Sequence, residues 1–110
     1  MKDLEYIVEF KYNPELDIIT IDKEGRSPEE YEESLPMGDY IVDIDNEGNF
    51  LGLELLNASQ NLPFNKEELE KIEKVELSLK ERGDARTIGV DIEYSGSKGK
   101  FSLGYATAKA

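Results

Sequence analysis

The feature that most constrains the fold is a pair of alternating segments joined by a turn, within residues 40–59. Apolar residues recur at every second position on both sides of the turn: Tyr40, Val42 and Ile44 before it, and Leu51, Leu53 and Leu55 after it. Side chains on a strand alternate between two faces, so this spacing predicts a β-hairpin with one apolar face. Folding the chain at residues 46–49 places Ile44 opposite Leu51, and Gly48 supplies the positive φ that a tight turn needs. We expect the other strands to be arranged around this hairpin.

The same hairpin matches a calcium-loop pattern. Asp43, Asp45, Glu47 and Glu54 occupy acidic positions of D-x-[DN]-x-[DN]-G-x5-E, with Glu47 in place of Asp or Asn. Carboxylate oxygens are the ligands that calcium and magnesium prefer. An EF-hand loop lies between two helices, however, and these flanks alternate as strands do. The favoured interpretation is therefore a solvated hairpin face, and the alternative is a weak calcium or magnesium site with these four residues as metal ligands.

Composition excludes several chemistries. The 110 residues contain no cysteine and no histidine, which excludes disulfides, thiolate metal sites and Ser-His or Cys-His catalysis. We therefore expect no catalytic residues, no cofactor and no enzyme, and an active-site carboxylate pair is the residual alternative. The chain shows neither a signal-peptide pattern nor an apolar run long enough for a membrane helix, so we expect a cytoplasmic protein that makes no membrane contact. A chain of this length predicts a single domain over residues 1–110.

The negative charge is concentrated in one part of the chain. The net charge is −12, and residues 13–54 hold thirteen acids but only two bases, Lys23 and Arg26. Residues 55–110 hold nine acids and nine bases. Nucleic acid is an unsuitable partner, because binding it needs clustered cations. A basic protein or a divalent cation is the partner that the charge favours.

The rest of the chain predicts an α+β fold, a mostly antiparallel β-meander of about six to seven strands with one helix near residues 66–74. Alternation predicts one first strand over residues 4–12, a return strand over 17–22 and two late strands over 88–94 and 101–105. Asn65 and Glu68 have capping-box spacing and should begin the helix. Residues 75–82 have strand spacing, with a continued helix as the alternative. Between residues 23 and 39 we expect a single helical turn capped by Ser27, or a short edge strand near Glu32 to Leu35.

Two stretches carry a family resemblance, Tyr12-Asn13-Pro14-Glu15-Leu16-Asp17-Ile18-Ile19-Thr20-Ile21 and Gly52-Leu53-Glu54-Leu55-Leu56-Asn57-Ala58-Ser59, and Asp43-Ile44-Asp45-Asn46-Glu47-Gly48 between them belongs to it as well. They resemble a family of small prokaryotic domains of unknown function that carry Tyr-Asp-Pro-Glu-x-Asp-x-x-Tyr-Ile and Gly-Ile-Glu-Ile-Leu-Asn-Ala-Ser. The chain departs from that pattern at Asn13, at Thr20 and in an acidic insertion around residues 26–37. The resemblance implies a family-like β-meander over residues 5–60, followed by a helix and C-terminal strands over 61–110. It supplies no catalytic residues.

These observations lead to two hypotheses of function. The first is a non-enzymatic interaction protein whose acidic half binds a basic protein partner. Some members of the resembling family are encoded beside small basic toxin-like proteins, which implies an antitoxin-like role. The alternative is the divalent-cation site on the hairpin. A meander also leaves sheet edges uncovered, which would allow a homodimer through one of them.

Overall fold

The computed structural model describes residues 2–31 and 33–106, which form nine antiparallel strands in two sheets. The four-stranded sheet has the order β1-β7-β8-β9: β1 (Lys2–Tyr6), β7 (Lys74–Arg82), β8 (Ala85–Tyr94) and β9 (Ser97–Ala106). The five-stranded sheet has the order β2-β3-β6-β5-β4: β2 (Val8–Asn13), β3 (Ile18–Lys23), β4 (Glu33–Met37), β5 (Tyr40–Ile44) and β6 (Phe50–Leu55). The predicted antiparallel α+β fold is confirmed, with more strands than expected and two short helices instead of one.

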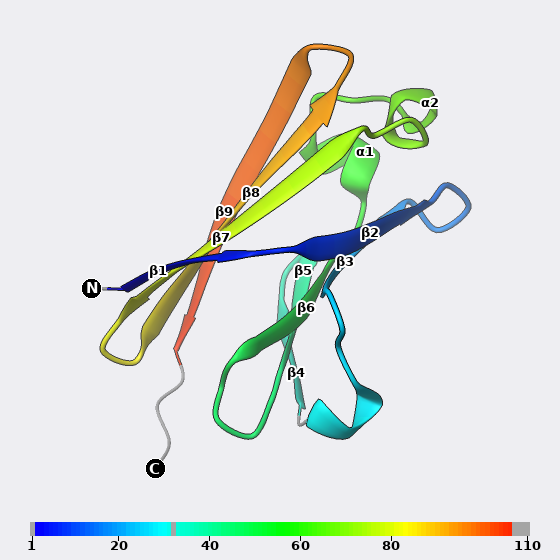
Figure 1. Ribbon diagram of the computed structural model, residues 1–110. Helices are drawn as coiled ribbons and strands as arrows, with labels where there is room; N and C mark the ends of the chain where they lie inside the picture. The colour runs from blue at the N-terminus through cyan, green and yellow to red at the C-terminus, as the bar shows by residue number, and fades with distance from the viewer. Residues whose placement is uncertain (1, 32, 107–110) are drawn as a thin grey trace.

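The first strand is divided between the two sheets. We predicted one strand over residues 4–12, but β1 ends at Tyr6 and β2 begins at Val8 (Figure 1). Tyr6 pairs with Leu77 in one sheet, and Val8 pairs with Lys23 in the other. The alternation of apolar side chains continues across the break, so the sequence pattern does not reveal it. This change of sheet at Ile7 joins the two layers directly.

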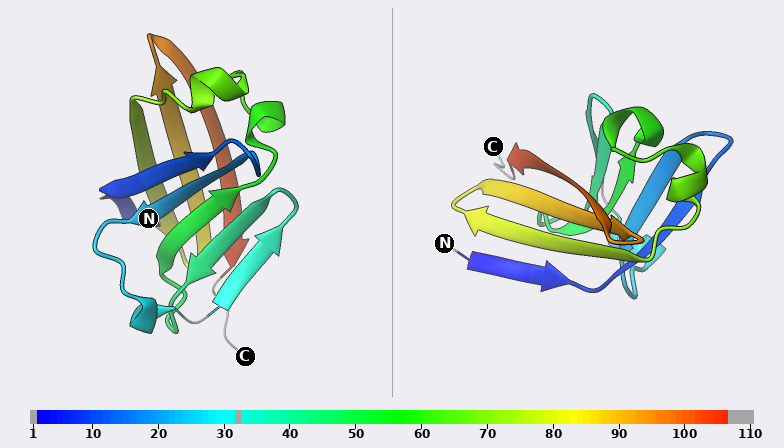
Figure 2. Two further views of the ribbon diagram at one scale, coloured as in Figure 1. Left: turned by 90° about the vertical axis from the view of Figure 1, so that its right-hand side faces the viewer. Right: turned by 90° about the horizontal axis from the view of Figure 1, so that it is seen from above.

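The inner faces of the two sheets enclose one hydrophobic core. Figure 2 (left) shows the five-stranded sheet in front of the four-stranded sheet, with the helices at one end. The fully buried side chains of this core come from both sheets and from the segment that joins them: Ile19, Ile21, Val42, Leu53, Leu55, Leu69, Leu79, Ile88, Val90 and Ile92. Aromatic contacts also connect the layers, since the Tyr6 and Phe50 rings lie 5.6 Å apart and the Tyr40 and Phe101 rings 5.3 Å apart.

The central hairpin follows the predicted register except next to its turn. Tyr40 pairs with Leu55 and Val42 with Leu53, as predicted, but Ile44 pairs with Phe50 instead of Leu51. The backbone N–H of Asp45 donates to the carbonyl of Asn49 at 3.0 Å, which closes the turn one residue earlier than expected. Leu51 is then the extra residue of a β-bulge, and it is fully buried. The predicted Ile44–Leu51 pair is therefore wrong.

The acidic insertion contains both predicted alternatives. A single 3₁₀ turn, η1 (Pro28–Glu30), has Ser27 as its cap, and the Glu30 side chain accepts from the Ser27 N–H at 3.0 Å. The edge strand β4 follows and pairs with β5. Glu32, the first residue of the predicted edge strand, lies outside the described residues.

Two short helices join the sheets: α1 (Ala58–Asn61) and α2 (Lys66–Leu69). The predicted capping box at the start of α2 is confirmed, because Asn65 accepts from the Glu68 N–H at 2.9 Å and the Glu68 side chain accepts from the Asn65 N–H at 3.0 Å. The helix ends at Leu69 instead of near residue 74. Residues 74–82 pair with β8 along their whole length, so the strand spacing over 75–82 gave the correct prediction. Within the described residues, no helix has the length and apolar character needed to cross a membrane.

Candidate binding surface on the acidic sheet

The four predicted metal ligands lie on the β5–β6 hairpin, but they do not converge. Asp43 is on β5, Asp45 and Glu47 are in the turn, and Glu54 pairs across from Ile41 and Thr20 near the middle of the sheet. Within residues 2–31 and 33–106, no group of three or more acidic side chains has a geometry that could hold a metal ion. Strands flank the turn where an EF-hand has helices. The cation site stays a prediction.

Two of these four carboxylates already bind groups of the protein. The Asp43 carboxylate accepts from Ser34 Oγ at 2.6 Å and forms an ion pair with Arg26 Nη1 at 2.9 Å. The Asp45 carboxylate accepts from the backbone N–H groups of Glu47 at 2.9 Å and Asn49 at 2.8 Å. Asp45 therefore holds its own turn together, as Asp side chains often do in turns. A cation at these oxygens would compete with both sets of contacts.

Arg26 is a functional candidate that the sequence interpretation did not single out. Its Nη1 lies 2.8 Å from Asp22 and 2.9 Å from Asp43, so one guanidinium connects β3 to β5. It passes over Gly52 on β6, where an added Cβ would overlap both the Asp22 carboxylate and the Arg26 guanidinium. The sequence feature that could have pointed to Arg26 is that it is one of only two bases within residues 13–54. Arg26 partly compensates the charge at the centre of this face, because it pairs with both Asp22 and Asp43.

A group of three carboxylates lies where η1 meets the β5–β6 turn. We call this region the acidic end: a hollow of about 320 Å³ lined by Glu29, Glu30, Tyr31, Asp45 and Asn46. The Tyr31 side chain is 45% exposed, and its hydroxyl forms a 2.9 Å hydrogen bond with Ser34 Oγ. Since Ser34 also binds Asp43, the Tyr31 ring is anchored to the sheet through its hydroxyl while its face stays open to solvent.

A second cluster, around Asp17, joins two segments that are far apart in the sequence. The Asp17 carboxylate accepts from Tyr12 Oη at 2.6 Å, from Ser59 Oγ at 2.7 Å and from the Ser59 N–H at 3.1 Å. The Asp17 carbonyl also accepts from the Ala58 N–H at 2.9 Å. These contacts fix the β2–β3 turn against the start of α1. The residues come from both stretches that carry the family resemblance.

Comparison with protein families supports that resemblance. Residues 9–59 match a family described as "Protein of unknown function (DUF2283)". This segment is a DUF2283 domain. Comparison with curated proteins and with solved structures gave no match.

The DUF2283 match corresponds to one layer of the molecule. It begins one residue after the start of β2, contains β3 to β6, and ends at Ser59 in α1. Sheet order shows that β2 to β6 make up the whole five-stranded sheet, while β1 and β7 to β9 belong to the other. The match also contains the Asp17 cluster, Arg26 and the acidic end. We call this five-stranded sheet, with its connecting turns, the DUF2283 sheet. Every predicted site residue therefore lies on the DUF2283 sheet.

The electrostatics of the Asp17 cluster suit a structural role. Burial opposes ionisation of Asp17, but the hydrogen bonds from Tyr12 and Ser59 outweigh that effect and hold its pKa below the ordinary value. Burial and the hydrogen bond to Asp17 raise the pKa of Tyr12. A carboxylate with a lowered pKa is a weak general base at neutral pH. The Asp17 carboxylate and its two hydroxyl donors hold the β2–β3 turn against the start of α1.

Proposed function

We propose that this protein is a non-enzymatic interaction module that binds a basic protein partner at the acidic end of its DUF2283 sheet. The observation that carries the proposal is the hollow around Tyr31, because it combines an exposed aromatic face with carboxylates from two loops. It lies in a segment whose net charge is −11 over residues 13–54. If the partner is a basic toxin, the module would have an antitoxin-like role.

The chemistry of the acidic end suits a lysine or arginine side chain. A cation can lie against the face of the Tyr31 ring and pair with the carboxylates of Glu29 and Glu30 at the same time. The hydrogen bond from Tyr31 to Ser34 limits the freedom of the ring before binding, so less conformational entropy is lost on association. Asp45 adds a third carboxylate whose position is fixed by its own turn.

The outer face of the DUF2283 sheet offers room for a protein-sized partner. In Figure 2 (left) this face is turned to the viewer, and no helix or strand of the described chain lies over its centre. Two of its central carboxylates, Asp22 and Asp43, are ordered by ion pairs with Arg26, so this part of the face is held in place beside the acidic end. The long-range attraction of a net charge of −12 would accelerate encounter with a basic partner, and salt would weaken it.

The test is affinity capture at low salt with three forms of the protein. Wild type should retain a basic protein, and the double variant Glu29→Gln/Glu30→Gln should lose about tenfold in affinity, if each charged contact contributes roughly 0.7 kcal/mol. Glutamine still provides an acceptor for the Ser27 N–H, so η1 should remain capped. The matched control, Glu67→Gln/Glu93→Gln, removes two charges outside the DUF2283 sheet and should bind like wild type. Equal retention by all three forms, or retention of no basic protein, would contradict the proposal.

A further inference from the structure

We propose that the free edge of β2 is a docking site for an extended segment of the basic partner, in which cationic and apolar residues alternate. The segment would add to the DUF2283 sheet as a further strand beside β2. This inference rests on the proposed function for the charge of the partner, but it concerns a different surface from the acidic end. Strand addition to an exposed sheet edge is a common mode of peptide recognition.

Backbone groups of β2 are directed at this edge. β2 is the first strand in the order β2-β3-β6-β5-β4, and its ladder is with β3. The Glu24 N–H donates to the Ile7 carbonyl at 2.9 Å, which makes Ile7 and Glu24 a hydrogen-bonded pair. In an antiparallel ladder such pairs alternate, so the next residues that bond to β3 are Glu9 and Lys11. The N–H and C=O groups of Phe10 and Tyr12 therefore point away from β3, towards the edge.

The two outer edges of the DUF2283 sheet differ in their protection. The opposite edge strand, β4, contains Pro36, which has no N–H to offer an incoming strand. β2 contains no proline, and three of the four exposed large apolar side chains of the described residues lie within residues 7–16. They are Ile7 at 76% exposure, Phe10 at 38% and Leu16 at 64%. β2 therefore lacks the proline that protects β4, and exposed apolar side chains lie on it at Phe10 and beyond its two ends at Ile7 and Leu16.

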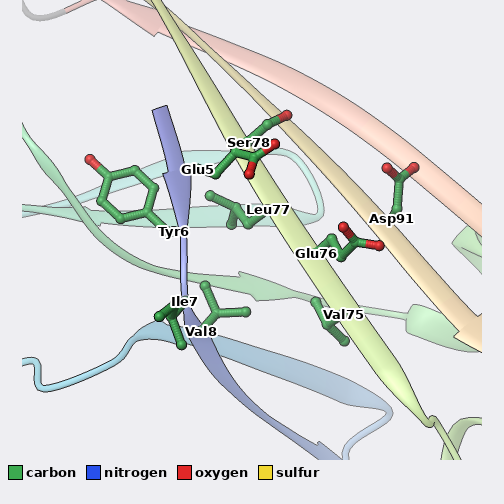
Figure 3. Close-up of a pocket in the computed structure, with 9 residues that line it drawn as sticks. All are labelled: Glu5, Tyr6, Ile7, Val8, Val75, Glu76, Leu77, Ser78 and Asp91. Carbon is green, nitrogen blue, oxygen red and sulfur yellow. The ribbon is translucent and has the colours of Figure 1, made fainter. Parts of the chain in front are cut away.

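A hollow of about 300 Å³ lies at the start of this edge, where β1 and β7 separate (Figure 3). Its apolar wall is formed by Ile7, Val8 and Val75. Figure 3 shows carboxylates from three neighbouring strands beside that wall: Glu5 on β1, Glu76 on β7 and Asp91 on β8. Lys74 compensates Glu76 with an ion pair at 3.3 Å. This end of the edge combines an apolar surface with negative charge.

A second hollow, of about 490 Å³, lies at the other end of β2, beside α2. Its lining is mostly apolar or aromatic, with one residue of each charge: Phe10, Lys11, Tyr12, Pro14, Leu69, Glu70 and Ile72. Phe10 and Tyr12 pair with Ile21 and Ile19, which are core residues, so both rings lie on the inner face of the sheet. An incoming strand would place alternate side chains against these rings.

Charge complementarity identifies the occupant. The carboxylates along the edge are Glu5, Glu9, Glu70, Glu76 and Asp91. Lys74 pairs with Glu76 and Lys100 lies across from Asp91, so Glu5, Glu9 and Glu70 remain against one base on β2, Lys11. A segment with lysine or arginine at every second position would meet this negative rim, while its intervening apolar residues would contact Phe10 and the hollow beside α2. A second copy of the chain is a poorer occupant, since each copy carries a net charge of −12.

Amide hydrogen exchange of the labelled protein tests the inference with a defined probe, a capped seven-residue peptide of alternating lysine and valine. In the free protein, Glu9 and Lys11 amides should exchange slowly, and Phe10 and Tyr12 amides rapidly. At a peptide concentration about ten times its Kd, exchange of Phe10 and Tyr12 should slow about tenfold. A control peptide with the same side chains and N-methylated valines carries the same charge but cannot complete a strand ladder, and it should give no protection.

Variants at Phe10 separate edge pairing from general attraction. Phe10→Pro removes an N–H that points to the free edge, so it should abolish protection of Tyr12 while Lys11 stays protected by β3. Phe10→Lys preserves the backbone and should also lose the peptide, because it replaces an apolar contact with a repelling charge. Phe10→Lys therefore still tests the inference if Phe10→Pro does not fold.

The other outcomes would overturn the inference. Equal protection by both peptides, or spectral changes confined to the acidic end, would exclude the β2 edge and leave the proposed function standing. Protection of Phe10 and Tyr12 that rises with protein concentration without peptide would identify a second copy as the occupant. Conversely, edge protection combined with unchanged partner capture by Glu29→Gln/Glu30→Gln would support the edge and contradict the acidic end as the binding surface.

Discussion

The two sheets share a core but differ in how they distribute charge. On the four-stranded sheet, most charged residues meet an opposite charge on the neighbouring strand, as Lys74 does with Glu93, Glu93 with Lys98 and Asp91 with Lys100, and the like-charged pair is Glu76 with Asp91. On the DUF2283 sheet, Arg26 pairs with two carboxylates, Asp22 and Asp43, and other acids gather in the insertion and the hairpin turn. Cross-strand pairs of opposite charge stabilise a sheet, whereas clustered like charges do not. This difference supports our proposal that the four-stranded sheet covers the core while the DUF2283 sheet presents the binding surface.

The two sheets also differ in how their strands are connected along the chain. β7, β8 and β9 follow one another as a meander, with ladders of nine and ten paired residues. The DUF2283 sheet places β3 beside β6, so it depends on contacts between distant residues such as Asp17 and Ser59. Loss of one such contact should therefore disturb the DUF2283 sheet more than a comparable surface change disturbs the meander.

The largest effect is expected from Phe50→Ala, which removes the ring that joins the DUF2283 sheet to Tyr6 of the other sheet. Phe50 is 1% exposed, so the free energy of unfolding should fall by about 3–5 kcal/mol. Urea unfolding followed by circular dichroism and by amide signals of both sheets should show one shared transition. The control Phe10→Ala removes a partly exposed ring and should cost less than about 1 kcal/mol. Two separate transitions would show that the sheets are independent units.

A smaller loss is expected from Asp17→Asn. The amide nitrogen cannot accept the hydrogen bonds of Tyr12 and Ser59, and an unsatisfied buried donor costs about 1–3 kcal/mol. Asparagine tolerates the positive φ of 56° at this position, so the backbone should be preserved. Because the folded pKa of Asp17 lies below its unfolded value, the wild-type stabilisation is present at neutral pH and lost as the pH falls through the folded pKa.

Denaturation between pH 7 and pH 3 should therefore reduce the difference between wild type and Asp17→Asn. The exposed neighbour provides the control, since Glu15→Gln should leave stability within about 0.5 kcal/mol of wild type. A difference that stays constant over this pH range would mean that ionised Asp17 does not hold the turn.

Two glycines, Gly99 and Gly52, allow the tightness of packing to be compared between the two sheets. An added Cβ at Gly99 of β9 would lie 2.9 Å from Phe64 Cε2 and 3.0 Å from Pro63 Cδ, which are parts of packed rings. Gly99→Ala should therefore destabilise by about 2 kcal/mol through overpacking. At Gly52 of the DUF2283 sheet the Cβ meets the flexible ends of Asp22 and Arg26, so Gly52→Ala should cost about 1 kcal/mol and weaken the ion pairs. Thermal unfolding of both variants measures the difference, and a reversed order would contradict this account of the packing.

The smallest effect at neutral pH is expected for Tyr105. Burial raises its pKa to about 12, and its hydroxyl donates to the Gly48 carbonyl at 3.1 Å. The folded pKa lies above the unfolded value, so this stabilisation is complete below about pH 10 and is lost as the pH rises towards 12. Tyr105→Phe should therefore show a weaker loss of stability above pH 10 than wild type. Identical pH profiles would mean that Tyr105 does not link β9 to the hairpin turn.

Local sequence patterns predicted much of this fold. The features that they did not predict depend on contacts outside the local pattern. Alternation located the Tyr40–Leu55 hairpin and the strand over 75–82, and the Asn65–Glu68 spacing located α2, because each depends on neighbouring residues. The shift of register at Leu51 arose from hydrogen bonds within the turn. The transfer of the first strand between sheets at Ile7 leaves the alternation unchanged, so periodicity cannot reveal it.

The candidate surface was less accessible to sequence reasoning. The charge of residues 13–54 indicated the half of the chain that contains the proposed surface, but the calcium-loop spacing drew attention to Asp43 and Asp45. Their oxygens bind Arg26 and the turn backbone, and a linear pattern cannot show such partners. The contact between Asp17 and Ser59 spans 42 residues and had only the family resemblance as a signal. Tyr31 became a candidate when the structure placed η1 beside the β5–β6 turn.

The most direct test of the central claim is an amide chemical-shift titration of the labelled protein with an oligolysine peptide at low salt. The claim predicts saturable shifts at Glu29, Glu30, Tyr31 and Asp45, with the outer-face amides of β8 and β9 unchanged. Glu29→Gln/Glu30→Gln should weaken these shifts, and Glu67→Gln/Glu93→Gln should not. Shifts spread evenly over both sheets, or concentrated on β8 and β9, would contradict the claim that the DUF2283 sheet is the binding layer.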